Sequence, residues 1–374
     1  MAAGTEWPAD EVAAMRAALG LARRGLGNVW PNPAVGCVIV NDGRIVGRGW
    51  TQPGGRPHAE TEALARAGTA ARGGTAYVSL EPCCHWGSTP PCAEALIAAG
   101  VRRVVAAVAD PDPRVSGQGL ARLREAGISV ESGLCAEEAA EVNAGFFSRI
   151  RRGWPLVTLK LAASLDGRIA TASGESRWIT GPAARERVHA LRAASDAVMV
   201  GTATASADDP ELTCRLPGLE ARSPVRVVLD RRLRLPAASH LIAGARTVPT
   251  WIVTLASADP ERREALKAAG VELLDAAADP NGGIDPGSAL RALGQRGITR
   301  LLIEGGARLA AALLRADLVD RVVWMQAPLL LGGDGLPAVA ALELNKLAAA
   351  PRFETVSLDA VGDDAMTTFR RRTE

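Results

Sequence analysis

The 374-residue chain lacks an excess of charge of either sign, since 43 basic and 41 acidic residues leave a formal net charge of +2. A nucleic-acid-binding surface needs a concentrated basic face, so this balance argues against a nucleic-acid partner. Lysine is also scarce, and only Lys160, Lys267 and Lys346 occur. Arginine supplies nearly all the basic side chains of this chain, so an arginine at any one position is weak evidence for a function.

Long apolar runs are missing as well. No segment approaches the roughly 18 apolar residues that a membrane-spanning helix needs. Residues 1–10 contain no apolar stretch behind a basic start, so we expect neither a secretory signal nor a membrane anchor. These absences predict a cytoplasmic protein, where thiols stay reduced. The six cysteines are therefore expected to be free, metal-bound or catalytic.

What the chain does have is a large apolar fraction, 48% of all residues, which is enough to form a sizeable core. Its length fits roughly two domains of about 100–200 residues each. A basic, glycine- and proline-containing stretch at residues 151–155 marks the expected boundary, which gives domains at residues 1–150 and 155–374. We find no internal repeat, so the two halves are expected to be different modules.

Helix and strand patterns alternate through both halves, which predicts α/β domains in which helices pack on sheets. In the first half, residues 11–24 have helical spacing with Asp10 as the expected N-cap, and residues 34–40 and 44–50 flank a turn at 41–43. Further helices are expected from about residues 59, 91, 119 and 136, and further strands at 75–80, 103–108 and 128–130. In the second half, strands are expected at 156–161, 197–200, 225–229, 250–253, 301–303 and 319–326, helices at 183–194, 260–269 and 307–315, and a surface loop at 275–286.

Metal-ligating side chains gather in one part of the first half. His58, Cys83 and Cys92 offer one imidazole and two thiolates, which are suitable zinc ligands. Three protein ligands leave a fourth position for water, as in catalytic rather than structural zinc sites. Zinc lowers the pKa of bound water to about 7, so hydroxide becomes available at neutral pH.

A zinc deaminase also needs a carboxylate that is not a ligand, to move protons between the water, the ring nitrogen and the leaving amine. Glu60 lies two residues after His58 at the expected start of a helix, so both side chains can face one pocket. The known pattern is H-x-E followed by P-C-x-x-C. Here the second part is stretched from Cys83 to Cys92, and the insertion at residues 84–91 is long enough to form a loop over the substrate. The pattern predicts a deaminase of an amino-pyrimidine.

Several alternatives stay open at this point. A structural zinc site of Cys83, Cys84, His85 and Cys92 would leave His58 and Glu60 unexplained, and a cluster of buried thiols without metal would do the same. We expect Cys84 to be a non-ligand that packs behind the site. A deaminase of free nucleosides or of tRNA is opposed by the balanced charge and leaves the second domain idle. A zinc-stabilised binding or regulatory protein would not need Glu60. The isolated Cys37, Cys135 and Cys214 are expected in the core.

Longer motifs resemble a known family, the bifunctional riboflavin-biosynthesis deaminase/reductases. In the first half the motifs are PNPAVGCVIV at 31–40, HAE at 58–60 and EPCCHWGSTPPC at 81–92, with the stretched cysteine spacing of that family. In the second half they are LKLAASLDGR at 159–168, GESRWIT at 174–180, ADDP at 207–210 and EGG at 304–306. The resemblance spans nearly the whole chain, and both sets occur in the expected order.

The resemblance implies a cytidine-deaminase-like, three-layer N-terminal domain and a dihydrofolate-reductase-like C-terminal domain. It implies that the first converts 2,5-diamino-6-ribosylamino-4(3H)-pyrimidinone 5′-phosphate to the aminouracil, and that the second uses NADPH to reduce the ribosyl group to ribityl. If this were wrong, the alternative is a deaminase of another aminopyrimidine nucleotide with an unassigned second domain. By position, His58, Cys83 and Cys92 become the zinc ligands and Glu60 the proton shuttle. The family also favours a homo-oligomer.

For the reductase, similarity places one set of residues near the substrate and another near the cofactor. The substrate set is Ser176, Arg192, Leu212, Arg215 and Glu304. The cofactor set is Ala162, Trp178, Thr204, Asp208, Gly306, Ala307, Arg308, Leu309, Ala310, Ala311 and Ala312. The residue types fit, because two arginines can hold a phosphate by paired N–H groups, a carboxylate can bind sugar hydroxyls, and a helix N-terminus can meet cofactor phosphate. Lys160 and Asp166 are candidate proton donors by position only.

Three positions depart from the family pattern. Asp112 stands where asparagine is usual, and Gln118 stands where lysine is common, so contacts to the deaminase substrate's phosphate are expected to change if these positions touch it. Arg231 follows Asp230 where a small hydroxyl residue occurs in the family. Our hypothesis is that Arg231 or Arg232 pairs with the 2′-phosphate of NADPH.

Overall fold

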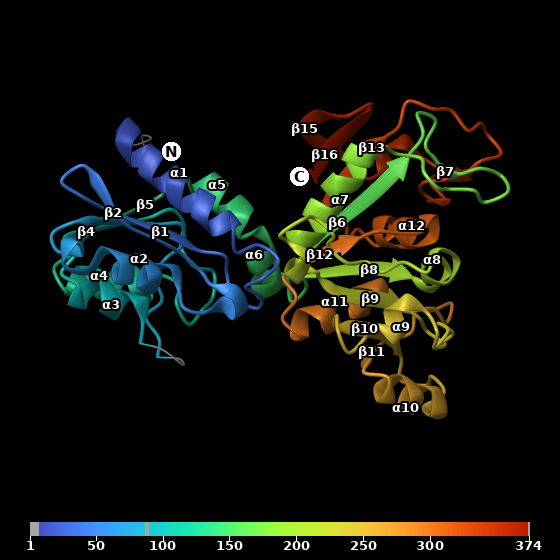
Figure 1. Cartoon of the computed structure of the whole chain (residues 1–374), viewed down its shortest axis with the longest axis horizontal. Helices are drawn as coiled ribbons and strands as arrows, with labels where there is room; N and C mark the ends of the chain where they lie inside the picture. Colours follow the sequence, from blue (N-terminus) through green and yellow to red (C-terminus); the bar gives the residue numbers. More distant parts are fainter. Residues whose placement is uncertain (1–6, 87–89, 373–374) are drawn as a thin grey trace. The chain divides into compact units, whose positions relative to one another are not determined.

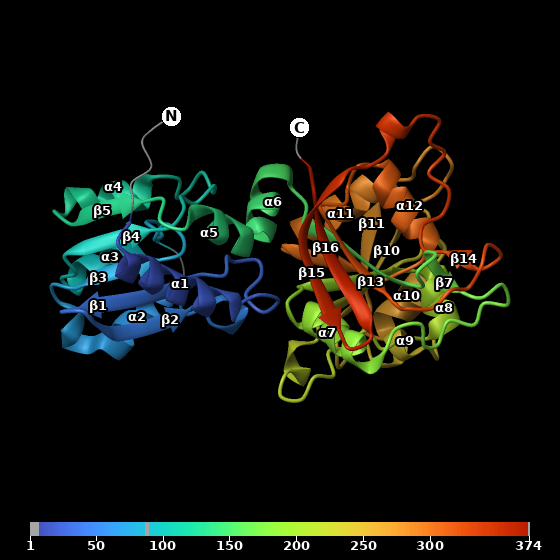
Figure 2. The same cartoon turned by 90° about the horizontal axis from the view of Figure 1, so that it is seen from above.

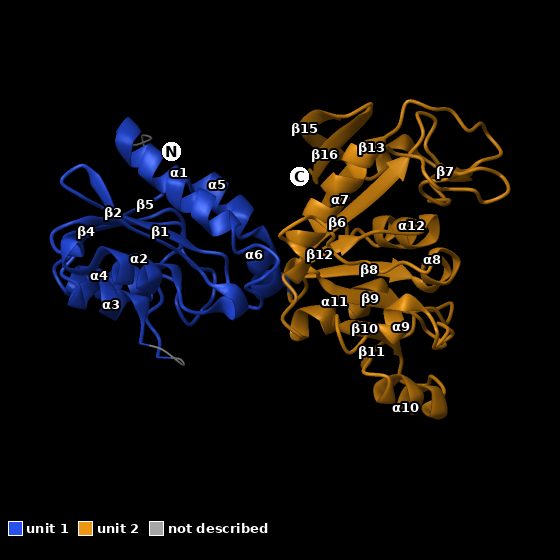
Figure 3. Cartoon of the chain, viewed as in Figure 1, with its two compact units in different colours: residues 1–152 blue, residues 153–374 orange. Residues whose placement is uncertain are grey.

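The structure is a computed structural model that describes residues 7–86 and 90–372. The chain divides into two compact units, residues 1–152 and 153–374 (Figure 3). Both are mixed α/β, which confirms the predicted fold class. Among the described residues, no helix combines the length and apolar character needed to cross a membrane.

Unit 1 is built on a five-stranded sheet with the order β2-β1-β3-β4-β5. β1 pairs antiparallel with β2 and β3, whereas β3, β4 and β5 run parallel. The strands are β1 Gly36–Asn41, β2 Arg44–Trp50, β3 Thr75–Val78, β4 Arg103–Ala106 and β5 Ser129–Ser132. The α-helices are α1 Ala9–Arg23, α2 Ala59–Ala67, α3 Cys92–Ala98, α4 Gln118–Glu125, α5 Ala136–Val142 and α6 Ala144–Arg152, and short 3-10 turns occur at Pro53–Gly55 and Gly68–Ala71.

Helices cover both faces of this sheet, so the unit has three layers (Figures 1 and 2). On one face, Met15 and Leu19 of α1 pack with Val38 and Val105 of the sheet. The opposite face has its own buried cluster, which joins residues of α2, α3 and α4 to alternate residues of β1, β3 and β4. Burial of alternate strand residues on opposite faces is what a period of two in a doubly covered sheet requires.

The helix that carries the predicted catalytic carboxylate lies unusually close to its strand. A Cβ at Gly47 would lie 2.3 Å from the Ala63 carbonyl oxygen, and a Cβ at Gly49 would lie 2.1 Å from the Ala59 carbonyl oxygen. Only glycine fits at these two positions of β2, because no other residue lets the backbones of α2 and β2 come so near. The start of α2 is thereby fixed on the sheet.

Unit 2 is built on a nine-stranded sheet with the order β11-β10-β9-β8-β12-β6-β13-β16-β15. The strands from β11 to β13 are parallel, and β16 and β15 add an antiparallel hairpin. The nine strands are β6 Leu156–Ala163, β8 Ala197–Gly201, β9 Val225–Leu229, β10 Thr250–Leu255, β11 Glu272–Ala276, β12 Arg300–Ile303, β13 Arg321–Gln326, β15 Phe353–Val361 and β16 Asp364–Arg371. The short strands β7 Arg168–Ala170 and β14 Leu336–Pro337 form a separate antiparallel pair. The α-helices are α7 Pro182–Ala193, α8 Thr202–Asp208, α9 His240–Ala243, α10 Pro260–Ala268, α11 Pro286–Gln295 and α12 Ala307–Arg315, with 3-10 turns at Glu220–Arg222 and Leu347–Ala349.

Two buried clusters lie within the core of unit 2. The larger joins Val198, Val228, Ile252 and Leu302, from four neighbouring parallel strands, to residues of α9 and α10. The smaller packs α7 against Val323 and Met325 of β13. Because β6, β8, β9 and β12 are parallel, their carboxyl ends meet at one edge of the sheet, which is where ligands bind in open α/β sheets.

Two local expectations are corrected. Asp10 is not an N-cap, because α1 begins at Ala9 directly after Pro8, whose carbonyl accepts from the Val12 amide at 3.1 Å. Asp10 instead lies in the first turn, where its charge suits the helix dipole. The expected loop at 275–286 begins later, because residues as far as Ala276 form the edge strand β11 alongside β10.

Candidate functional site

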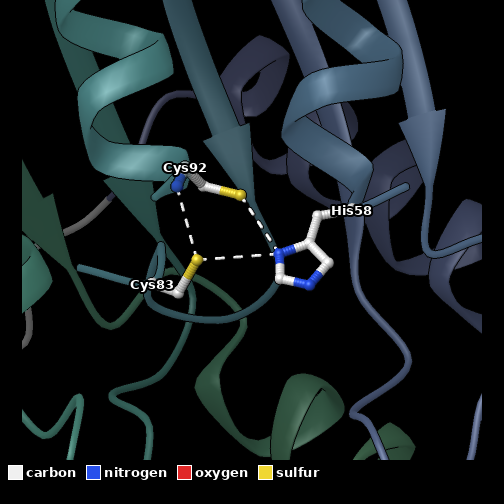
Figure 4. Close-up of side chains that lie close together, drawn as sticks. All are labelled: His58, Cys83 and Cys92. Atoms are coloured by element: carbon white, nitrogen blue, oxygen red, sulfur yellow. Dashed lines mark hydrogen bonds between the residues drawn. The ribbon is translucent and has the colours of Figure 1, made fainter. Parts of the chain in front are cut away.

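His58, Cys83 and Cys92 come together in unit 1, as Figure 4 shows. His58 is the N-cap of α2, Cys92 is the first residue of α3, and Cys83 lies in the segment after β3. The His58 Nδ1 atom lies 3.3 Å from the Cys92 Sγ and 3.6 Å from the Cys83 Sγ (Figure 4). The Cys92 backbone amide also approaches the Cys83 Sγ at 3.3 Å.

These residues fit zinc in both chemistry and spacing. Zn–S bonds of about 2.3 Å and Zn–N bonds of about 2.0 Å at a tetrahedral angle place nitrogen and sulfur roughly 3.5 Å apart. Both observed separations agree with that spacing. Within residues 7–86 and 90–372 no other group of three ligating side chains is found. Cys84 stands apart, with its Sγ 3.8 Å from the Arg114 carbonyl oxygen, so the four-residue set with Cys84 and His85 is not assembled.

Glu60 lies beside this cluster in the first turn of α2 and is only 3% exposed. Burial, together with the negative charge of Cys83, raises the pKa of Glu60 to about 7. Hydrogen bonding from Cys92 holds the pKa of the Cys83 thiol at about 4. A carboxyl that changes protonation near neutral pH can both take and return a proton at that pH.

A cavity of about 310 Å³ opens over the cluster and is lined by His58, Glu60 and Cys83. Glu81 helps to shape it, since this buried carboxylate accepts from the backbone amides of Asp110, Gly117, Gly119 and Leu120 at 3.0–3.3 Å. Gly119 passes so close that a Cβ there would lie 1.9 Å from the Pro82 carbonyl oxygen. Glu81 therefore holds the loop at residues 110–120 against the segment that carries Cys83.

Asp112 and Gln118, the two residues of this loop that differ from the family pattern, differ in their relation to the cavity. Asp112 lines the cavity and accepts from the Arg114 guanidinium at 2.5–3.1 Å. Gln118 is exposed, is not among the lining residues, and donates to the Pro113 carbonyl oxygen at 3.3 Å. Of the loop predicted over the substrate, residues 87–89 lie outside the described residues.

The sequence reasoning did not single out several polar residues that line this cavity, among them Asn32, Arg56, Asp110, Arg114 and Arg149. Asn32 falls inside the motif at 31–40 and Asp110 lies two residues before Asp112, but neither was predicted as a site residue. Arginine is so common in this chain that Arg56, Arg114 and Arg149 carry no pattern of their own.

In unit 2, a second cavity of about 440 Å³ collects many of the residues predicted for the reductase. The lining includes the whole predicted substrate set, Ser176, Arg192, Leu212, Arg215 and Glu304. It also includes Ala162, Trp178, Thr204 and Asp208 from the predicted cofactor set. These side chains come from separate strands, helices and loops, which the fold brings to one place.

Glu304 and Arg192 form a buried ion pair in the wall of this cavity. Arg192 donates Nε and Nη2 to the two carboxylate oxygens of Glu304 at 2.5 and 2.8 Å, and donates Nη1 to the Thr213 carbonyl oxygen at 2.9 Å. Burial would raise the pKa of Glu304, but the charge of Arg192 and its hydrogen bonds hold that pKa below its usual range. Arg215 is half exposed and pairs with Glu211 at 2.6 Å.

The two candidate proton donors are in different settings. Lys160 lines the cavity, and burial lowers the pKa of its ammonium group although the charge of Glu304 opposes this. Asp166 is not among the lining residues. Its carboxylate instead accepts from the Ser164 hydroxyl and from the backbone amides of Leu331 and Gly332. Hydrogen bonding from Ser164 lowers the pKa of Asp166 to about 2.

The remaining predicted cofactor residues, Arg231 and residues 306–312, are not among the residues that line this cavity. Gly306 is the N-cap of α12 with φ +78°, and Thr204, a lining residue, lies 3.0 Å from where its Cβ would be. Ala310 and Ala311 are buried in the core, whereas Arg308 is exposed. Arg231 follows β9 and donates to the Gly282 carbonyl oxygen at 2.6 Å.

A His/Cys/Cys centre beside a buried glutamate is the arrangement of a zinc deaminase, and unit 2 is a second α/β domain with a polar cavity of its own. Family models agree with this division. Residues 8–108 match the cytidine and deoxycytidylate deaminase zinc-binding region, and residues 155–367 match the RibD C-terminal domain.

Relatives match over nearly the whole chain. The riboflavin biosynthesis protein RibD of Escherichia coli (strain K12) is 45% identical over 361 residues, covering 94% of this chain and 96% of the relative. The solved structure of Acinetobacter baumannii RibD, form 1, has a TM-score of 0.87 and 40% identity, covering 97% of this chain and 99% of that one. A deaminase/reductase structure from Thermotoga maritima has a TM-score of 0.85 and 34% identity, with 97% and 99% covered.

The chain belongs to the RibD family of riboflavin biosynthesis, and it is a bifunctional deaminase and reductase. The second domain, which the alternative readings left unassigned, is the RibD reductase domain.

Proposed function

We propose that unit 1 deaminates 2,5-diamino-6-ribosylamino-4(3H)-pyrimidinone 5′-phosphate and that unit 2 then reduces the ribosyl side chain with NADPH, giving 5-amino-6-(5-phosphoribitylamino)uracil. The observation that carries the first reaction is the position of Glu60 beside His58, Cys83 and Cys92 in one cavity. The Thermotoga maritima relative is named as a deaminase and reductase of these compounds, which supports the substrate assignment. In this proposal residues 1–150 hold the deaminase and residues 155–374 the reductase.

In the first reaction, His58, Cys83 and Cys92 would hold one zinc ion, which would make water a nucleophile at neutral pH. Glu60 takes one proton from water as the oxygen attacks the ring carbon that bears the amine, and passes this proton to the ring nitrogen. Glu60 then takes the second proton from the new hydroxyl group and gives it to the amine, which leaves as ammonia while the carbonyl forms. The pKa of Glu60, about 7 through burial, suits both directions of transfer.

In the second reaction, the substrate lies against Ser176, Leu212, Arg215 and Glu304, and the cofactor lies along Ala162, Trp178, Thr204 and Asp208. The Arg192 guanidinium donates to both carboxylate oxygens of Glu304, so Arg192 orients this carboxylate toward the sugar hydroxyls. Arg215, half exposed at the cavity wall, meets the phosphate. NADPH supplies a hydride to the ribosyl carbon. We assign the accompanying proton to Lys160, which lines the cavity and whose ammonium group has a pKa lowered by burial.

The cofactor phosphates lie at the carboxyl ends of the parallel strands, against the first turn of α12 after Gly306, because Ala310 and Ala311 are buried in the core. Arg231 follows β9, which is separated from β12 only by β8. We assign Arg231, with Arg232, to the 2′-phosphate of NADPH. Equal catalytic efficiency with NADH and NADPH would contradict that assignment.

We further place the enzyme in the cytoplasm as a homo-oligomer. None of the six cysteines forms a disulfide, which suits a reducing compartment. The oligomer follows the family resemblance, and the molar mass of the purified enzyme in solution tests it.

A coupled assay on the zinc-loaded protein tests the two reactions together. The diaminopyrimidine ribosyl phosphate is supplied with NADPH, and ammonia release and NADPH oxidation are followed in the same sample. We expect ammonia first and then a loss of NADPH that depends on it. Ammonia without NADPH oxidation would leave the first reaction standing and contradict the second.

A further inference from the structure

His189 of α7 lines the reductase cavity but belongs to neither the predicted substrate set nor the predicted cofactor set. It precedes Arg192 by three positions, so the two side chains share one face of the helix. Arg192 donates Nη1 to the Thr213 carbonyl oxygen at 2.9 Å. The Arg215 backbone amide donates to His189 Nδ1 at 3.2 Å. The segment at residues 212–215 is therefore attached to α7 at two neighbouring points, one through a donor and one through an acceptor.

These hydrogen bonds define which nitrogen of His189 carries the proton. Nδ1 lies 3.2 Å from the Arg215 amide nitrogen and 3.1 Å from the Thr213 carbonyl oxygen, but one ring nitrogen cannot accept and donate at once. The Thr213 oxygen already accepts from Arg192, whereas a backbone amide needs an acceptor. All three groups are satisfied when Nδ1 accepts and the proton is on Nε2, which makes the imidazole neutral.

The surroundings of His189 also favour the neutral ring. Burial lowers the pKa of its imidazole, and the charges of Arg192 and Arg215 lower it further. The Thr213 carbonyl and the charge of Glu304 act in the opposite direction. A proton added to Nδ1 would face the amide proton of Arg215, so protonation of His189 breaks the hydrogen bond between them.

The segment that His189 holds has a backbone conformation that needs support. Leu212 has φ +54°, a left-handed conformation that is unfavourable for a residue with a side chain. Such a conformation persists only where its surroundings fix it. Leu212 and Arg215 both line the cavity, and the Arg215 side chain pairs with Glu211 at 2.6 Å. The position of this segment therefore decides where the Arg215 guanidinium meets the substrate.

We propose that neutral His189 is a positioning residue of the reductase cavity, whose Nδ1 holds the Arg215 amide and so places the Arg215 side chain against the phosphate of the substrate. Protonation of His189 releases this hydrogen bond and frees the segment at 212–215, so the affinity for the phosphorylated substrate falls. This inference rests on the proposed second reaction, in which Arg215 meets the phosphate.

The test uses the full chain and supplies the aminouracil intermediate directly with NADPH, in phosphorylated and dephosphorylated forms. His189→Leu has a side chain of similar volume but cannot accept the amide. We expect it to raise KM for the phosphorylated form about 3–10-fold, as the loss of one hydrogen bond implies. Its kcat, its KM for NADPH and its KM for the dephosphorylated form stay near the unmutated values. Arg187→Leu, at an exposed position of α7 that is not among the lining residues, changes none of them.

His189→Gln separates the hydrogen bond from the charge of the ring, because a side-chain carbonyl accepts from an amide and does not titrate. We expect its KM for the phosphorylated form to stay near the unmutated value at neutral pH. As the pH falls from about 7.5 to about 5, kcat/KM of the unmutated enzyme should fall more than that of His189→Gln. Comparing the two enzymes cancels the titration of the substrate's own phosphate, whose second pKa is about 6.

Three results would overturn the inference: a rise in KM for both forms or for neither in His189→Leu, a folded His189→Gln that behaves like His189→Leu, or coinciding pH profiles. An unmutated enzyme that does not distinguish the two forms would also overturn it, while the proposed reduction would stand. No NADPH oxidation by the unmutated enzyme with either form would instead contradict the reduction itself. Melting temperature shows that each variant is folded, and ammonia release by unit 1 should not change.

Discussion

Arg192 donates hydrogen bonds to both carboxylate oxygens of Glu304 in the wall of the reductase cavity, and the side chains of Arg192 and Glu304 are only 11% and 8% exposed. Removing one partner of a buried pair leaves an uncompensated charge and costs about 3–5 kcal/mol. We therefore expect Arg192→Met to lower the melting temperature of the reductase unit and to abolish NADPH oxidation. Ammonia release should persist, because every residue that lines the deaminase cavity belongs to unit 1.

The double variant Arg192→Met with Glu304→Met separates structure from function. It replaces the pair by apolar side chains, so most of the lost stability should return while NADPH oxidation stays absent. Calorimetry and the coupled assay measure the two effects. A double variant as unstable as Arg192→Met alone would show that the pair is not what sets the stability of this region.

Glu60→Gln should keep zinc and lose deamination. The amide preserves the size of the side chain but does not carry protons, so ammonia release is expected to fall about 10²–10⁴-fold. The matched control is Glu62→Gln, two positions further along α2, where the carboxylate forms an i,i+4 pair with Arg66. NADPH oxidation of the separately supplied aminouracil intermediate should be normal in both. Ammonia release by Glu60→Gln at the unmutated rate would disprove the assigned proton shuttle.

Cys83 and Cys84 are adjacent in sequence but should differ completely in zinc binding. Cys83→Ala removes a ligand atom from the cluster, whereas the Cys84 sulfur lies near the Arg114 carbonyl outside it. Metal analysis of the purified variants is expected to give about one zinc per chain for Cys84→Ala and almost none for Cys83→Ala. Loss of zinc from Cys84→Ala would revive the structural site that includes Cys84 and His85.

We expect the buried Asp110 carboxyl to make the free energy of unfolding of unit 1 depend on pH. Burial raises its pKa to about 6, so the folded state binds a proton more tightly than the unfolded chain. Stability from this group is present below about pH 4 and is lost as the pH rises through about 6. Asp110→Asn keeps the oxygen that accepts from the Asp112 amide. Its melting temperature should exceed that of the unmutated protein by about 2–4 °C at pH 8 and by less at pH 5. An equal difference at both pH values would contradict the shift.

Much of this molecule was predictable from residue patterns. Residue patterns placed β2, β9 and α12 at their observed bounds and α2 at its observed first residue. The hairpin of β15 and β16 was missed, although Val356, Leu358 and Ala360 alternate with polar residues. Its outer strand is largely exposed at the sheet edge, so its apolar content is too low for a core strand.

The metal cluster was predictable because zinc chemistry restricts the residue types, and because two of the three ligands begin helices whose starts can be recognised in the sequence. The arrangement around it was not. Nothing in the sequence pairs Arg192 with Glu304, which are 112 positions apart, and a lone helical arginine is usually solvated. Likewise, Glu81 gathers four amides from a loop about 30 residues further along, and only the folded chain shows this.

Gly47 and Gly49 have no side chain to offer the reaction, yet they decide where His58 and Glu60 stand. A methyl group at either position would meet a carbonyl oxygen of α2 at 2.3 or 2.1 Å, and the helix would have to shift away from the sheet. Such a shift moves a metal ligand and the proton carrier together, because both lie at the start of α2. In a survey of single substitutions scored by growth, changes at Gly47 and Gly49 would thus be as harmful as changes at the predicted zinc ligands. The positions that tolerate no substitution would then include residues of the sheet as well as those of the site.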